Sequence, residues 1–193
     1  MDVNTTRLSP PKMSRMSIHG EGQATHPAAL RNDPIEMARQ QWVDHGWGAA
    51  AEGMAAITSL MRAHQIALAR VETALKPLGV TFARYEVLML LYFSRRGSLP
   101  MKVIGSRLQV HPTSVTNAVD RLEDAGLVTR STHPDDRRAI LVALTPSGRR
   151  LAEEATAVLN AEVFSQPDLS AHDLAQLVDV LTRLRRSAGD FGV

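Results

Sequence analysis

The chain has 193 residues, 44% hydrophobic and 22% charged, proportions that suit a globular protein of one domain with extensions. It contains no cysteine, which excludes disulfide bonds, thiol catalysis and cysteine metal sites. No run of 18 apolar residues and no apolar segment of a signal peptide occur, so we expect a cytoplasmic protein with no membrane partner. The net charge of +2 is too small to indicate a partner by itself.

The N-terminal region is predicted to hold a tail and a short helix. Residues 1–32 contain prolines and scattered polar residues without periodicity, which predicts a disordered tail. An additional N-terminal helix is expected over residues 33–48, because Asp33 is a suitable helix cap and Pro34 suits the first helical position.

A long helix is predicted from residue 49, with apolar residues spaced by three and four, and it ends at Pro77 and Gly79. The predicted helix together with its C-terminal end spans residues 49–79. His64 lies on the apolar stripe of this helix. It is either a core histidine or a contact to a ligand.

Three shorter helices follow in the sequence. Thr81 caps the first, FARYEVLMLLYFS, which is apolar on nearly every face and is therefore predicted to be central. RRGSL is interpreted as a connector. The second helix is PMKVIGSRLQV, and the third is HPTSVTNAVDRLEDAG, which Gly126 closes.

A β-hairpin is predicted next, with strands LVTRST and AILVALT joined by HPDDRR. Two helices joined by a tight turn and followed by a hairpin form a winged helix-turn-helix, which is expected over residues 80–144. Residues 145–188 then form two helices, which begin at Thr145 with Pro146 and at Ser170. The predicted fold class is mainly α with a small β-hairpin wing.

The third short helix has two different faces. Val115, Val119 and Leu122 form an apolar stripe. The opposite face is polar and consists of Thr113, Ser114, Thr116, Asn117, Asp120 and Arg121. This face is either an ordinary solvated surface or a surface that contacts base edges in the major groove of DNA. The hairpin that follows favours DNA.

Specific contacts follow from the chemistry of this face. Asn117 suits adenine, the methyl group of Thr116 suits thymine, and Arg121 suits guanine or a phosphate. Pro112 starts the helix, where free backbone N–H groups can bind a phosphate. Thr113 and Ser114 complete the predicted DNA-binding set on this helix.

The hairpin loop is unusually charged. Residues 95–138 contain eight cationic and five acidic residues, which gives a local excess of three positive charges. Ordering a free arginine side chain costs about 1.5–2 kcal/mol, so a nearby carboxylate that holds it in advance favours binding. We therefore predict that Asp135 positions Arg137 in the minor groove and that Arg138 contacts a phosphate. The alternative is a solvated, charge-balanced turn.

The motifs PTSVTNAVDRLEDAGLV, PDDRRAILVALT and TPSGRRL resemble those of the MarR-type winged-helix regulators, over about residues 49 to 186. The resemblance implies a homodimer held by its first and last helices. It also implies binding to a pseudo-palindromic double-stranded operator, usually as a repressor, and release by a small ligand. The sequence departs from the family at His111, where the family usually has a serine or threonine cap.

The additional helix is similar to that of a family branch that responds to urate and trans-aconitate. That resemblance implies ligand contacts by Trp42, Trp47, Glu86 and Arg130, and His64 is a further candidate. Ala118 stands where the urate-responsive members have an arginine. The run from Phe82 to Glu123 looks most like the members that respond to trans-aconitate and citrate. The expected effector is thus a small anionic metabolite.

Three alternatives remain. The effector is urate or another purine or phenolic compound, the two tryptophans only anchor the additional helix, or the protein binds DNA without a ligand. An enzyme is not expected, because no H-E-x-x-H, G-x-S-x-G or G-x-x-x-x-G-K motif is present. We predict no catalytic residue, no metal site and no cofactor.

Overall fold

A computed structural model describes residues 30–133 and 136–192. The chain divides into two compact units, one ending at Ala55 and the other beginning at Ala56. Residues 30–32 of the predicted tail contain no helix or strand, and the rest of that tail lies outside the described residues. None of the helices in the described ranges is long and apolar enough to cross a membrane.

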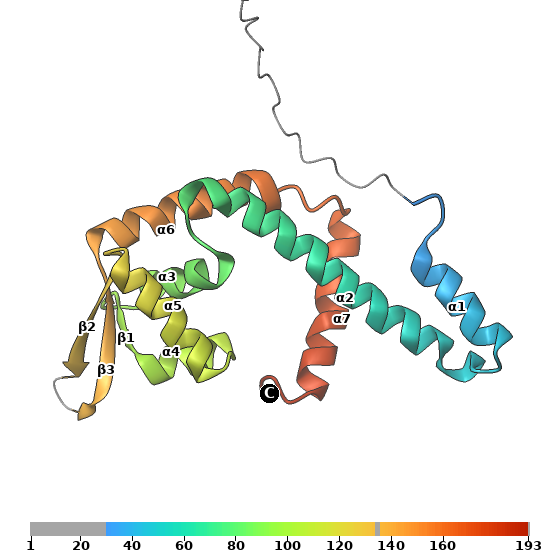
Figure 1. Cartoon of the computed structure of the whole chain (residues 1–193), viewed down its shortest axis with the longest axis horizontal. Helices are drawn as coiled ribbons and strands as arrows, with labels where there is room; N and C mark the ends of the chain where they lie inside the picture. The colour runs from blue at the N-terminus through green and yellow to red at the C-terminus, as the bar shows by residue number, and fades with distance from the viewer. Residues whose placement is uncertain (1–29, 134–135, 193) are drawn as a thin grey trace, which may run out of the picture. The chain divides into compact units, whose positions relative to one another are not determined.

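The first unit contains helix α1 (Pro34–Asp44) and the beginning of α2 (Gly48–Leu75), which are labelled in Figure 1. The predicted cap is confirmed, because Asp33 Oδ1 accepts a hydrogen bond of 2.9 Å from the backbone N–H of Ile35. Gly46, which follows the C-cap His45 of α1, adopts a left-handed φ of 82° that allows the chain to turn into α2.

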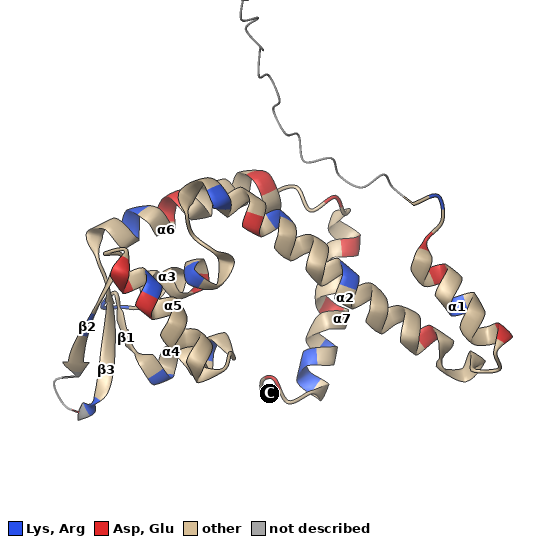
Figure 2. Ribbon diagram, in the orientation of Figure 1, with Lys and Arg blue, Asp and Glu red and all other residues tan. Residues whose placement is uncertain are grey.

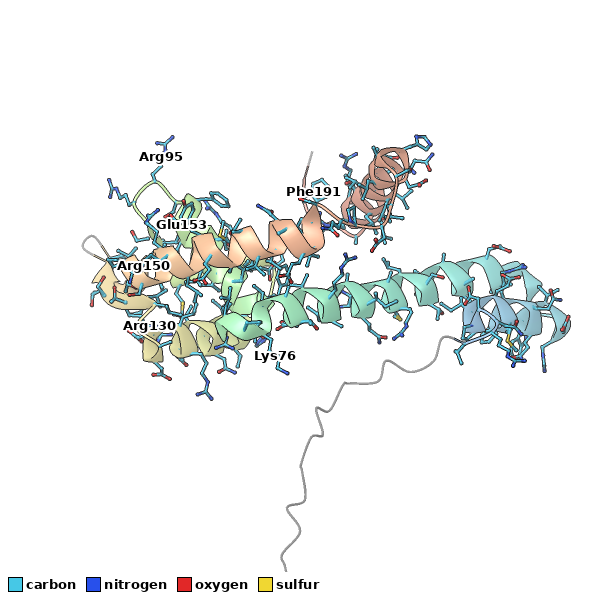
Figure 3. The ribbon with its side chains drawn as sticks, turned by 90° about the horizontal axis from the view of Figure 1, so that it is seen from above. Lys76, Arg95, Arg130, Arg150, Glu153 and Phe191 are labelled. Carbon is cyan, nitrogen blue, oxygen red and sulfur yellow. The ribbon has the colours of Figure 1, made fainter. Side chains whose placement is uncertain are left out.

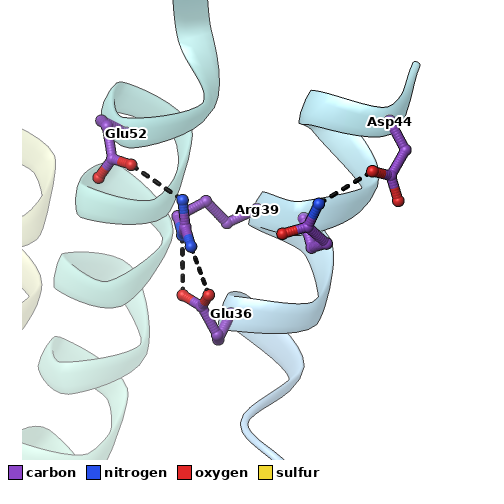
Figure 4. Close-up of polar contacts among 5 residues, drawn as sticks. Glu36, Arg39, Asp44 and Glu52 are labelled. Carbon is purple, nitrogen blue, oxygen red and sulfur yellow. Dashed lines mark hydrogen bonds and ion pairs between the residues drawn. The ribbon is translucent and has the colours of Figure 1, made fainter. Parts of the chain in front are cut away.

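Ion pairs connect α1 to the first turns of α2. Arg39 binds both carboxylate oxygens of Glu36 and donates a hydrogen bond of 3.0 Å to Glu52 (Figure 4). The hydrogen bonds from Arg39 lower the pKa of Glu36 below its ordinary value. These contacts are exposed, so they orient the two helices more than they stabilise them.

The second unit contains the rest of α2, seven further helical segments and a three-stranded sheet (Figure 1). In chain order the elements after α2 are η1 (Lys76–Leu78), α3 (Phe82–Phe93), β1 (Ser98–Pro100), α4 (Met101–Leu108), α5 (Pro112–Asp124), β2 (Val128–His133), β3 (Asp136–Leu144), α6 (Pro146–Leu159), the π-helical η2 (Asn160–Phe164) and α7 (Ala171–Ser187). The predicted fold class is confirmed, and so are the predicted caps Thr81, Thr145 and Ser170.

The sheet differs from the predicted hairpin in having a third strand. Its order is β1-β3-β2 and all its pairs are antiparallel. Strand β1 comes partly from the segment interpreted as a connector, and its Ser98 pairs with Ala143. Three residues have too little periodicity to be recognised as a strand, and Pro100 is tolerated because β1 is an edge strand.

The strands of the wing also extend further into the predicted loop than expected. Strand β3 begins at Asp136, and β2 extends to His133 with an irregular register after Thr132. Arg137 and Arg138 therefore belong to a strand and not to the loop. The pairing of the two backbones outweighs the low strand propensity of this charged segment.

A single hydrophobic core fills the winged domain. The predicted stripe of α5 is confirmed, because Val115, Val119 and Leu122 are all buried. They pack in one cluster with residues of α2, α3, α4, the sheet and α6, among which Leu75, Leu88, Leu91, Ile104, Val142 and Leu159 are fully buried. This packing fixes the orientation of α5 relative to the sheet.

The apolar side chains of α2 and α7 are largely exposed in the single chain. The side chains of Met61 and Val178 are 63% and 62% exposed, and α7 has no buried residue. Only the last turns of α2, with Val71 and Leu75, enter the core. His64 is exposed as well, so the interpretation as a core histidine is wrong for the single chain.

Candidate nucleic-acid interface

The polar face of α5 is exposed, as predicted. Thr113, Ser114, Thr116, Asn117 and Arg121 all lie on the surface, opposite the three buried apolar residues of this helix. Figure 2 shows that the charged residues of α5 occupy its C-terminal half. The N-terminal half therefore presents neutral donors and acceptors, which are the groups that distinguish base edges.

The start of α5 is capped by the unusual histidine. Nδ1 of His111 accepts a hydrogen bond of 3.3 Å from the backbone N–H of Thr113. Pro112 occupies the first helical position. His111 thus caps the helix in place of the serine or threonine that the family resemblance led us to expect, although its hydrogen bond is long.

Two side chains of α5 remain available for a partner. Within the described part of the chain, no hydrogen bond or ion pair engages the side chain of Asn117 or of Arg121. Thr116 differs, because its hydroxyl donates a hydrogen bond of 3.1 Å to the carbonyl of Pro112. Its methyl group is then the part left for an apolar contact.

Arg130 of β2 is bound to α5 by several contacts. Its guanidinium lies 2.5 Å from Asp120 Oδ1 and 3.0 Å from Glu123 Oε2, and its backbone N–H donates to Glu123 Oε1 at 3.2 Å. The side chain is only 25% exposed. Arg130 is labelled in Figure 3. The bridge joins the wing to α5.

Sequence reasoning missed the two acidic partners of this bridge. Asp120 and Glu123 are three residues apart, so both project from the same side of a helix, and Arg130 follows in the next strand. That spacing was the available signal. A ligand bound by Arg130 would compete with both carboxylates.

The tip of the wing is described only in part. Asp135 lies outside the described residues, and the side chain of Arg137 is not described, so the expected Asp135–Arg137 pair stays a prediction. Arg138 is exposed, and its backbone N–H donates a hydrogen bond of 3.0 Å to Asp136 Oδ1. Its side chain is therefore accessible from solvent.

The predicted ligand residues lie in both units. Trp42 and Trp47, in the first unit, contact each other edge to face with ring centroids 5.3 Å apart, and Trp47 is 55% exposed. In the second unit, His64 lies exposed on α2, and Glu86 is half-buried on α3. Burial raises the pKa of Glu86 above its ordinary value.

A hollow of about 400 Å³ lies where α2 meets α3 in the second unit. Lys76 and Arg84 contribute positive charge to its lining, and Thr73 and Thr81 contribute hydroxyl groups. Glu72 also lines it, but its carboxylate already accepts a hydrogen bond of 2.9 Å from the backbone N–H of Phe82. The sequence analysis did not identify Lys76, because only the fold brings it beside Arg84.

Comparisons with known proteins give consistent results. Residues 80–140 match the family model described as MarR family. A MarR family transcriptional regulator of Streptomyces coelicolor, Sco5413, is 48% identical, with a TM-score of 0.67 over 74% of this chain and 99% of that structure. The transcriptional repressor MdtR of Bacillus subtilis is 33% identical over 57% of this chain and 70% of its own length. CouR of Rhodococcus jostii, solved with p-coumaroyl-CoA, is 30% identical, with a TM-score of 0.58 over 69% and 92% of the two chains.

Proposed function

The chain belongs to the MarR family of transcriptional regulators, and on this premise we propose that it is a homodimeric, ligand-responsive repressor that binds a pseudo-palindromic DNA operator. The observation that carries the DNA-binding role is the amphipathic helix α5, held by three buried side chains beside a wing with its polar face exposed. MdtR, which is 33% identical, is a transcriptional repressor, and this supports repression as the function.

The proposed DNA contacts follow this geometry. The neutral N-terminal half of α5, with Thr113, Ser114, Thr116 and Asn117, enters the major groove, while Pro112 leaves the first backbone N–H groups for a phosphate. Arg121 reaches the edge of the groove. The wing contributes Arg137, positioned by Asp135, in the minor groove and Arg138 at the backbone.

The proposed homodimer follows from the apolar surface of α2 and α7. Exposed apolar side chains on both helices are costly in water, and a second copy of the chain would bury them. In the proposed dimer a twofold axis relates two α5 helices, and a separation of about 34 Å would match successive half-sites on one side of a duplex.

The proposed effector is a small anionic metabolite, with citrate or trans-aconitate as the first candidates. Lys76 and Arg84 at the hollow between α2 and α3 supply the cations that a carboxylate requires. Trp42, Trp47, Glu86, His64 and Arg130 remain candidate contacts. The alternative effectors are phenolic compounds and urate. Phenolic compounds are supported by CouR, which was solved with p-coumaroyl-CoA.

The DNA-binding role is tested by measuring operator and random-duplex affinity at several salt concentrations. Asn117→Ala is expected to reduce discrimination by about 1–3 kcal/mol, because it removes contacts to one base. Arg138→Ala is expected to weaken binding to both duplexes and to flatten the salt dependence. Arg62→Ala, an exposed substitution on α2, serves as the control. Unchanged binding in both variants would remove the proposed interface.

The effector is tested on the protein–operator complex at constant ionic strength. Citrate, trans-aconitate and urate are titrated separately, and release of DNA is followed by fluorescence anisotropy. An allosteric coupling of about 1–3 kcal/mol shifts the operator affinity roughly 5- to 150-fold. Arg84→Ala should abolish the response to the carboxylates without changing DNA affinity in their absence. No release by any of the three at millimolar concentration would contradict this effector class.

A further inference from the structure

A second hollow, of about 370 Å³, opens beside the turn between α3 and β1. Three arginines line it, Arg95 and Arg96 from the turn and Arg107 from α4, and its lining includes no acidic residue. Within residues 30–133 and 136–192, no hydrogen bond or ion pair engages these three side chains. The hollow therefore concentrates positive charge that no residue of the described ranges pairs with.

Such a cluster favours an anion with several acceptor oxygens. Like charges around one hollow repel each other, and an anion bound among them removes that repulsion. The planar guanidinium groups of arginine bind phosphate through two parallel hydrogen bonds, which a lysine cannot reproduce. The hydroxyl-bearing Ser98 also lines the hollow and is able to bind a phosphate oxygen.

The hollow also has an aromatic wall. Phe93 is 75% exposed, the highest value among the large apolar side chains of the described ranges. Its ring contacts Tyr92 edge to face, at 5.7 Å between centroids. Tyr92 is itself held by a hydrogen bond of 3.1 Å to Glu153 and by Arg149, which lies 4.8 Å from its ring centroid. Phe93 is thus supported on one side and open for stacking on another.

We propose that this hollow binds a nucleotide, a small molecule whose phosphates lie among Arg95, Arg96 and Arg107 while its base stacks on Phe93. The volume is within the range of sites for small molecules. Aromatic stacking on a base contributes about 1–3 kcal/mol and does not depend on which base is present.

The geometry favours a free nucleotide over duplex DNA as the occupant. In Figure 3, Arg95 and Arg130 lie on opposite sides of α6, and Arg130 marks the side where the wing meets α5. The adjacent β1 residue Ser98 pairs with Ala143, near the end of β3 that is remote from the wing tip. A duplex also keeps its base faces stacked inside, where Phe93 has no access to them.

The test is isothermal titration calorimetry of the full chain with ADP, adenosine and pyrophosphate. ADP is expected to bind at least about tenfold more tightly than adenosine, because adenosine lacks the phosphates. The double variant Arg95→Gln/Arg96→Gln should lower ADP affinity by about tenfold or more. Phe93→Ala should lower ADP affinity about fivefold or more and leave pyrophosphate affinity unchanged, because only ADP carries a base.

Controls separate this site from the DNA interface. Arg62→Ala should bind ADP as the unchanged protein does, and circular dichroism melts verify that each variant is folded. Equal affinities for ADP and adenosine would overturn the proposal, as would arginine variants that bind ADP normally but lose duplex affinity. Because no DNA is present in the titration, its result does not depend on whether operator binding is confirmed.

Discussion

Gly148 illustrates a requirement that operates at a single residue. It lies in the first turn of α6, where its backbone N–H donates a hydrogen bond of 3.0 Å to Thr145 Oγ1. A Cβ at this position would lie 2.0 Å from the carbonyl oxygen of Leu127 and 3.0 Å from Leu144 Cδ1. From the sequence alone, Gly148 is only a residue of low helix propensity in the TPSGRRL motif. The steric requirement is not visible there, because Leu127, whose carbonyl excludes a side chain at this position, lies 21 residues earlier in the chain.

Gly148→Ala is therefore expected to destabilise the fold by roughly 1–3 kcal/mol, since the colliding atom belongs to the backbone and cannot turn aside. Chemical denaturation measures the change. Gly53→Ala on α2 is the matched control, because nothing lies within 4 Å of its added Cβ, and alanine should stabilise that helix by about 0.5–1 kcal/mol. Equal behaviour of the two variants would contradict the packing at α6.

Glu86 gives a prediction of the pH dependence. Burial raises its pKa in the folded state above the ordinary value of 4.5, so ionisation of this carboxyl opposes folding. The cost is absent below the ordinary pKa and grows as the pH rises from 4.5 through the folded-state pKa. Glu86→Gln should therefore raise the melting temperature at neutral pH, and the difference should disappear near pH 4 or below. An equal difference at both pH values would exclude desolvation as its cause.

Among the elements, polar contacts of Arg130 join α5 to the wing in addition to the apolar packing that orients them. The apolar stripe of α5 and the capping residues of most helices were correctly predicted from local sequence patterns. The strand β1 and the acidic partners of Arg130 were not, because they depend on pairing between segments. Arg130 joins β2 to both Asp120 and Glu123, so it links the wing to the helix it flanks.

Arg130→Lys tests this link while keeping the positive charge. A lysine cannot bind both carboxylates with a planar fork, so the wing should become more mobile while global stability falls by only about 1 kcal/mol. Amide hydrogen exchange in β2 should become faster. Arg183→Ala, which removes an exposed ion pair with Asp179 on α7, should leave exchange in β2 unchanged. Unaltered β2 exchange in the lysine variant would show that packing alone holds the wing.

For the molecule as a whole, the exposed apolar side chains of α2 and α7 are the observation that supports the proposed homodimer. The periodicity of α2 predicted a helix with an apolar stripe, but only its last turns are buried within the chain. A stripe of this kind has the same sequence pattern whether it packs in its own core or against another copy. The burial in the single chain distinguishes these cases.

Met61→Glu combined with Val178→Glu is expected to convert the proposed dimer into a monomer, because it places charges on both exposed apolar surfaces. Light scattering coupled to size-exclusion chromatography measures the mass. Operator affinity should fall when the dimer is lost, because a monomer has one α5 helix and binds only one half-site. Ile140→Glu on the wing is the control and should not change the mass. A double variant that still forms a dimer would place the interface elsewhere.

Local sequence patterns were sufficient to predict the order of the helices, most of their caps, the buried stripe of α5 and the polar face opposite it. These features depend on local spacing and on side chains close to one another in the chain. The folded chain was needed to show that Ser98–Pro100 forms a third strand, that Arg130 is held by two carboxylates, and that arginines from the α3–β1 turn and α4 share one hollow. These arrangements join segments that are separate in the sequence, and the core that brings them together is formed by the whole domain.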